Sequence, residues 1–85
     1  MLFFKKKQID ILRSLVQMRE CTLSELARAS GANVGYTSNL VMRMELEGLA
    51  ERQNRGTEVI VKATEKGIEI GKIVTKCFEE YEKRR

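Results

Sequence analysis

The sequence lacks histidine, tryptophan and proline altogether, and its two cysteines lie 56 positions apart. Without histidine, the commonest general base and the commonest metal ligand are both missing. The cysteine spacing matches no zinc site, and neither a glycine-rich phosphate loop nor a G-x-S-x-G elbow occurs. These absences argue against an enzyme, and we predict no catalytic residue, no metal site and no cofactor.

Long apolar runs are missing as well. No uninterrupted apolar run approaches the ~20 residues that a membrane helix needs. The start, MLFFKKK, has too few apolar residues before its lysines to be a signal peptide. We therefore expect a cytoplasmic protein (in the host cytoplasm if the source is a virus) with no membrane partner.

The composition that is present is moderately apolar and mildly basic. Apolar residues make up 42% of the 85 residues, the net charge is +4 and the pI is about 9.3. This predicts one small globular domain over residues 1–85, whose core would gain from burial against a second copy. The charge permits nucleic-acid binding without demanding it. Segment 22–49 carries only two basic residues against three acidic ones, so the positive charge lies elsewhere.

Segment 22–49 predicts two short helices joined by a tight turn. Thr22 and Glu25 have the spacing of a capping box at the start of the first of these helices. Gly31 suits a left-handed C-cap, and Asn33 suits the N-cap of the helix that follows. In that helix an apolar stripe recurs with helical spacing and predicts its buried side, namely Thr37, Leu40, Val41 and Met44.

The flanking segments predict one more helix before this unit, which is the first in the chain, and a hairpin and a last helix after it. Residues 1–19 show a helical apolar stripe at Ile9, Leu12, Leu15 and Val16. Residues 50–63 predict two short strands, 50–53 and 57–62, with the turn at 54–56. Residues 64–85 predict a last helix capped by Thr64. The expected fold class is therefore mainly α with a small β-hairpin (α+β).

The order helix, helix, helix, hairpin, helix resembles the winged helix-turn-helix family of DNA-binding domains, and within it MarR-like regulators and the compact winged-helix proteins of archaea and their viruses. Three local patterns carry the resemblance, which covers residues 12–74: LSELA at 23–27 followed by Gly31, VMRM at 41–44 with EGL at 47–49, and ATEKG at 63–67. The last is similar to the L-T-x-K-G that opens the dimer helix of MarR-like proteins. The chain has a shorter wing and lacks the helices that form the ligand pocket of full MarR regulators, so no small-molecule ligand is expected.

The resemblance implies that the third helix reads double-stranded DNA in the major groove while the hairpin, the wing, contacts the backbone or the minor groove. Ser38 and Asn39 are expected at base edges, unless they form an ordinary solvated face. Arg43 is expected at a phosphate, the alternative being an ion pair with Glu47. The full set of predicted DNA-binding residues is Asn33, Val34, Gly35, Tyr36, Ser38, Asn39, Arg43, Arg52, Asn54 and Arg55.

Several of these residues have a second interpretation that the sequence leaves open. Tyr36 donates to a phosphate or packs against the preceding helix. Arg52 and Arg55, which bracket the expected hairpin tip, grip DNA or merely solubilise a hairpin edge. The run of lysines at 5–7 contacts phosphates or forms a solvated helix start.

The last helix carries a wide apolar stripe that needs a partner surface, and we expect it to form a homodimer interface. The predicted interface residues are Phe3, Phe4, Ile70, Ile73, Val74, Cys77, Phe78 and Tyr81. Cys77 is either a small buried residue or forms a disulfide with Cys77 of a second copy. A disulfide between Cys77 and Cys21 within the chain is the alternative.

Taken together, these patterns predict a sequence-specific DNA-binding transcriptional regulator, most simply a repressor, that binds a pseudo-palindrome as a homodimer. Two alternatives remain open at this point. One is a winged-helix module for protein–protein interaction, which the near-neutral reading helix favours. The other is a replication or partition factor that uses the same fold on origin DNA.

Overall fold

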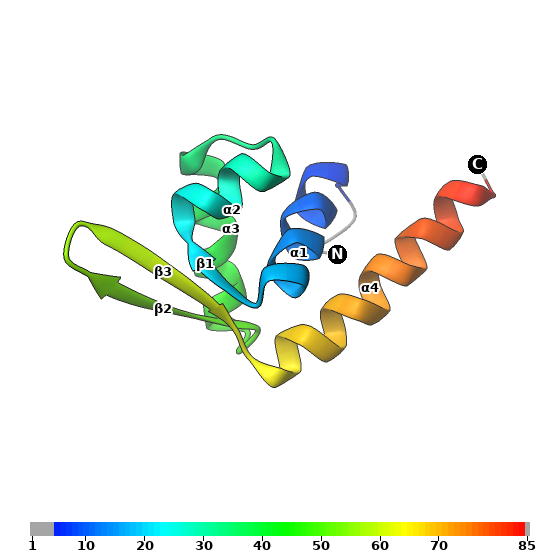
Figure 1. Ribbon diagram of the computed structural model, residues 1–85. Coiled ribbons are helices and arrows are strands. Elements are labelled where there is room, and N and C mark those ends of the chain that lie inside the picture. Colours follow the sequence, from blue (N-terminus) through cyan, green and yellow to red (C-terminus); the bar gives the residue numbers. More distant parts are fainter. Residues whose placement is uncertain (1–4, 85) are drawn as a thin grey trace.

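The computed structural model describes residues 5–84, which form four helices and one small antiparallel sheet (Figure 1). The elements in chain order are α1 (Lys6–Met18), β1 (Glu20–Thr22), α2 (Leu23–Ser30), α3 (Val34–Leu46), β2 (Ala50–Arg55), β3 (Glu58–Ala63) and α4 (Glu65–Lys83). The predicted α+β fold class is confirmed. No helix in the described part of the chain is long and apolar enough to cross a membrane.

The core lies between the first three helices and the sheet. Ile9, Leu12 and Leu15 of α1 are buried as predicted, and Ile11 joins them, whereas Val16 is only partly buried beside α4. The remaining core side chains come from every other element except α4, and include Leu26, Leu40, Val41, Met44, Leu49 and Val61. Burial of one apolar side of each element holds the three helices in a fixed arrangement.

The predicted signals for the two central helices are confirmed. The Thr22 hydroxyl accepts the Glu25 N–H at 3.0 Å, and the Glu25 carboxylate accepts the Thr22 N–H at 2.8 Å. Gly31 ends α2 with a φ of 65°, in the left-handed region that favours glycine. Asn33 caps α3 by accepting the Tyr36 N–H at 2.7 Å.

A third strand, β1, was not anticipated from the sequence. It pairs antiparallel with β3, so that Cys21 faces Val61, and the order in the sheet is β1-β3-β2. Arg19 closes α1 with a positive φ of 66°, and its carbonyl accepts the Ala63 N–H at 2.8 Å. The strand therefore exists because the hairpin supplies its partner.

The predicted turn at 54–56 is wrong by one to two residues. β2 extends through Arg55, which pairs with Glu58, and the turn consists of Gly56 and Thr57. Gly56 has a φ of 63°, as the first position of a two-residue hairpin turn of type II′ requires. Asn54 and Arg55 lie in the strand instead, and the hairpin is longer than expected.

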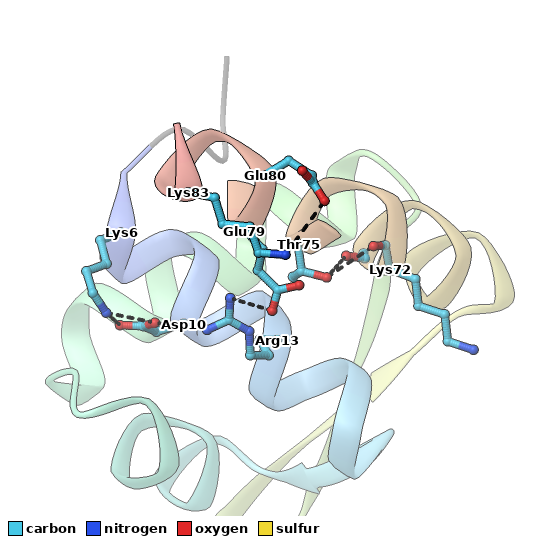
Figure 2. A network of polar contacts seen from close by, with 9 residues as sticks. Lys6, Asp10, Arg13, Lys72, Thr75, Glu79, Glu80 and Lys83 are labelled. Carbon is cyan, nitrogen blue, oxygen red and sulfur yellow. Dashed lines mark hydrogen bonds and ion pairs between the residues drawn. The ribbon is translucent and has the colours of Figure 1, made fainter. Parts of the chain in front are cut away.

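The last helix packs against α1 along much of its length, from Gly71 beside Val16 to Glu79 beside Arg13. Figure 1 shows α4 and the β2–β3 hairpin extending from the helical core on opposite sides, and the molecule measures 45 × 24 × 20 Å. Gly71 permits the close approach, since a Cβ there would lie 2.5 Å from a Val16 methyl group. In Figure 2 the Arg13 guanidinium of α1 lies between the carboxylates of Asp10 and Glu79, each at 3.7 Å.

Candidate nucleic-acid interface

One side of α3 is held outward because its other side is fully committed to the core. Thr37, Leu40, Val41 and Met44 are all buried, as the apolar stripe predicts. The Thr37 hydroxyl, which is completely buried, donates to the carbonyl of Asn33 at 2.9 Å, so its burial leaves no polar group without a hydrogen bond. The opposite side therefore has a defined orientation.

That outward side combines polar and apolar side chains. Asn39 and Arg43 are exposed and Ser38 is half-buried. Val34 and Met42 expose 49% and 45% of their surface. Such a side can present an amide and a hydroxyl to base edges and apolar groups to thymine methyls.

The first turn of α3 carries backbone N–H groups that no helix partner satisfies. Asn33 satisfies the N–H of Tyr36, and the backbone of Thr37 is bonded to the Asn33 carbonyl. Gly35 is exposed in this turn, and a Cβ there would make only an ordinary contact of 3.5 Å with the Asn33 side chain. Packing within the chain thus does not require a glycine at this position.

Arg43 does not form the alternative ion pair with Glu47. Among residues 5–84 its guanidinium has neither an ion pair nor a hydrogen bond. It lines a cleft between α3 and the start of α1 together with Tyr36 and Asn39. Tyr36 itself is 36% exposed.

The two wing arginines occupy different environments. Arg55 adjoins the hairpin turn, is exposed and has no ion pair with any described residue, and Asn54 beside it is exposed too. Arg52 pairs with Val61 nearer the hairpin base, so the expectation that it brackets the tip is wrong. The Arg52 guanidinium donates to the Glu45 carboxylate at 2.9 Å, and its backbone N–H donates to the same carboxylate at 3.3 Å.

Acidic side chains line the surface between α3 and the wing, which sequence patterns did not indicate. Glu25 and Glu58 border a cleft of about 550 Å³ together with Val34 and the residues around Thr57. The backbone N–H of Thr22, bonded to the Glu25 carboxylate, lowers the pKa of that group below its ordinary value, so Glu25 is charged at neutral pH. This side of α3 is therefore less favourable to phosphate than the side facing α1.

The predicted dimer stripe on α4 divides into two parts. Val74 and Phe78 pack partly buried against the core. Ile70, Ile73, Cys77 and Tyr81 are exposed, Ile73 by 59% and Tyr81 by 61%. Spacings of three, four and four place these exposed residues on one narrow side of the helix. Phe3 and Phe4, the other predicted interface residues, lie outside the described residues.

The end of α3 is tied to the start of α4. The Thr64 hydroxyl donates to the Gly48 carbonyl at 2.7 Å and also accepts the Gly67 N–H at 2.9 Å, which confirms its predicted cap. The Lys66 ammonium donates to the Glu47 carbonyl at 3.0 Å. The outward side of α3 and the exposed stripe of α4 are therefore held in a fixed relation.

Both cysteines are free, so the disulfide within the chain is not formed. The interpretation of Cys77 as a buried residue is wrong, because it is exposed on α4, whereas Cys21 is buried in β1. Burial, with a smaller effect from the charges of Glu25 and Glu20, raises the pKa of the Cys21 thiol to about 11. Within residues 5–84 no group of three potential ligands is placed to hold a metal ion.

Comparisons with known proteins agree with this geometry. Residues 4–56 match the MarR family. The fold is similar to AF1382 of Archaeoglobus fulgidus (20% identity, TM-score 0.82, covering 95% of this chain and 93% of that one). It is also similar to BpsR of Bordetella bronchiseptica, whose DNA binding is regulated by 6-hydroxynicotinic acid (17% identity, TM-score 0.83, covering 95% of this chain and 59% of that one). A third similar structure is MepR of Staphylococcus aureus, a transcription regulator of the multidrug efflux pump MepA (24% identity, TM-score 0.73, covering 94% of this chain and 62% of that one).

The chain thus spans nearly all of the Archaeoglobus protein but only about three fifths of BpsR and MepR. At these identities the structural likeness shows the fold alone. No curated protein gives a significant sequence match to this chain.

Proposed function

Because the chain belongs to the MarR family of transcription regulators, we propose that it binds double-stranded DNA as a homodimer and represses transcription by occluding a promoter. The observation that carries the proposal is the outward side of α3. Its Asn39 and Arg43 are exposed, and the hairpin beside it ends near an unpaired Arg55.

In this proposal α3 lies in the major groove. Ser38 and Asn39 contact base edges, where an asparagine amide suits adenine. The N–H groups of Val34 and Gly35, which have no partner in the helix, and the positive end of the helix bind a phosphate. Gly35 lets the DNA backbone approach closely, which explains a glycine that packing within the chain does not require.

The wing contacts DNA through its tip. Arg55 and Asn54 reach the backbone or a narrow minor groove, where the negative potential attracts arginine. In the free protein the Arg52 guanidinium is bonded to Glu45 of α3, so this carboxylate competes with phosphate for Arg52.

The homodimer forms through the exposed stripe of α4, with Ile73 and Cys77 near its centre. A two-fold axis there relates two copies of α3, which would lie about one helical turn of DNA apart, ~34 Å. The tie between Thr64 and Gly48 transmits the dimer geometry to α3. A pseudo-palindromic site follows from this symmetry.

No small-molecule effector is needed in this proposal. Small-molecule sites are lined predominantly by hydrophobic and aromatic residues, whereas most of the residues that line four surface clefts among residues 5–84 are of polar or charged type. The structurally similar BpsR does respond to 6-hydroxynicotinic acid. Adding that compound to a duplex titration tests the difference, and an unchanged Kd is the expected result.

The experiment that tests the proposed function is selection of bound duplexes from a random library, followed by titration of the selected duplex at several salt concentrations. We expect a symmetric motif whose half-sites are centred 10–11 bp apart, with log K falling linearly with log salt. An asymmetric motif would contradict the dimer. Failure to bind any duplex at low salt would contradict DNA binding itself.

One observation favours a second candidate, docking of another polypeptide on α3. Leu46 is 88% exposed at the end of the helix, one turn beyond the exposed Met42. A docked protein would bury both side chains. The same duplex titration distinguishes the two, because a docking module would bind DNA weakly and without sequence preference.

A further inference from the structure

A cleft of about 240 Å³ separates the start of α1 from α3, and its lining is unusual in charge. The lining residues are Lys5, Gln8, Tyr36, Asn39, Leu40 and Arg43. Two of them are cations and none is acidic. Three other surface clefts of the molecule each include two glutamates. We propose that this cleft binds one phosphate group of the DNA backbone, an inference that rests on the proposed function.

The three lysines at the start of α1 differ in the partners of their ammonium groups. The Lys6 ammonium pairs with Asp10 at 3.3 Å. The Lys7 ammonium donates to the carbonyl of Gly31 at 3.0 Å and that of Ser30 at 3.4 Å, and so closes the end of α2. The Lys5 ammonium has no partner within residues 5–84 and lies at the cleft. Only this lysine is available to an outside anion.

The side chains facing Lys5 across the cleft are also donors without partners. The Arg43 guanidinium and the Tyr36 hydroxyl make no hydrogen bond with any described residue. The Gln8 side-chain oxygen accepts the Lys5 N–H at 3.4 Å, which leaves the amide group of Gln8 free to donate. Two cations and several neutral donors around one small cleft suit a single anion, because charge-assisted hydrogen bonds are stronger than those between neutral groups.

The position of the cleft identifies the anion as a backbone phosphate. Tyr36, Asn39 and Arg43 follow one another at spacings of three and four, so they lie along one flank of α3. A helix with side chains is ~10–12 Å wide and fills a major groove of ~12 Å, so each flank faces a phosphate backbone. The other flank is occupied by the Glu45–Arg52 pair and borders Glu58. The flank facing α1 is therefore the one equipped to hold a phosphate.

The inference predicts that Lys5 and Arg43 act on the same phosphate. In titrations with the selected duplex between 50 and 200 mM salt, Lys5→Gln and Arg43→Gln should each weaken binding about tenfold. Loss of one phosphate contact lowers the salt slope by about 0.9. Because the phosphate is shared, the double variant should lose little more slope than either single variant.

Lys72→Gln is the matched control, since Lys72 is an exposed cation on α4 that extends away from α1 in Figure 2. It should keep the wild-type slope. A scan with single neutral methylphosphonate linkages provides a second measurement. One linkage should weaken the wild type and leave the double variant unaffected.

Three outcomes would overturn the inference. The first is a slope for both single variants equal to that of Lys72→Gln. The second is additive loss, with Lys5→Gln and Arg43→Gln each insensitive to a different methylphosphonate, because it would mean two separate phosphates. The third is a wild type that binds no duplex, which would overturn the proposed function together with the inference, whereas the first two leave the proposed function standing. Unfolding midpoints equal to that of the wild type verify that each variant is folded.

Discussion

Gly67 packs directly against the backbone of Leu49, at the point where α3 gives way to the sheet. A Cβ on Gly67 would overlap the Leu49 carbonyl oxygen and lie 2.8 Å from its carbonyl carbon. The same carbonyl accepts the Thr64 N–H at 3.1 Å, so the backbone there cannot easily move. This contact joins the helix proposed to read DNA to the helix proposed to form the dimer.

We predict that Gly67→Ala destabilises the protein by about 3 kcal/mol, because the new methyl group meets backbone and not a flexible side chain. Gly35→Ala is the control, since its Cβ would meet only a side-chain oxygen at 3.5 Å. That change should leave stability unchanged or raise it by about 0.5 kcal/mol. Urea unfolding followed by circular dichroism measures both. Equal midpoints for the two variants would mean that the close approach of α4 is not required.

We predict that Glu45→Gln tightens DNA binding by a factor of about two to five at low salt. The substitution removes a carboxylate from the flank of α3 and frees the Arg52 guanidinium for phosphate. Both side chains are about one third exposed, so the loss of the ion pair should cost less than ~1 kcal/mol of stability. Glu69→Gln, the same change of charge on α4, should leave affinity as it is. Weaker binding by Glu45→Gln would show that the pair positions the wing.

We predict that Ile73→Lys converts the proposed homodimer into a monomer, because it places a charge in the exposed apolar stripe of α4. Glu69→Gln changes the net charge by the same amount outside the stripe and should remain dimeric. Sedimentation velocity at several protein concentrations distinguishes the two species. A dimer that survives Ile73→Lys would place the interface elsewhere.

We predict that stability falls as pH rises from 9 to 11, in part because of Cys21. Its thiol has a folded-state pKa of about 11 against an ordinary value of 9.0, so in this range the unfolded chain loses a proton that the folded chain keeps. The contribution is complete below pH 9 and is lost as pH passes the folded-state value. The test is the difference in the free energy of unfolding between the wild type and Cys21→Ala over this pH range, in which the variant should lose less stability.

The reactivity of the two cysteines gives an independent check on the same burial. In the Ile73→Lys variant, which should be monomeric and leave Cys77 uncovered, iodoacetamide at pH 8 should modify Cys77 quickly and Cys21 only on unfolding. Equal labelling rates by mass spectrometry would contradict the burial of β1.

Local signals predicted much of this fold. The Thr22–Glu25 capping box and the Asn33 cap involve residues three apart, and helical spacing alone defines the buried stripe of α3. β1 was missed because its three residues gain strand structure only from β3, forty positions away in the pairing of Cys21 with Val61. Short strands of this kind have no periodicity of their own.

The candidate site was harder to predict in detail because its contacts join separate elements. The Glu45–Arg52 bond links α3 to β2. Among residues 5–84 Lys7 is engaged and Lys5 is not, because the carbonyl groups at the end of α2 lie beside Lys7. Likewise, periodicity placed Val74 in the same stripe as Ile73, and only the packing of α4 on α1 separates the buried residue from the exposed one.

The most direct test of the central claim is an amide NMR titration of the protein with its selected duplex. If the outward side of α3 and the hairpin tip bind DNA, the largest shift changes will fall on residues 33–43 and on Gly56, with a smaller change at Lys5. The amides of residues 69–83 of α4 will stay where they are in the free dimer. Changes confined to α4, or to Leu46 and its neighbours with residues 33–39 unmoved, would contradict the account.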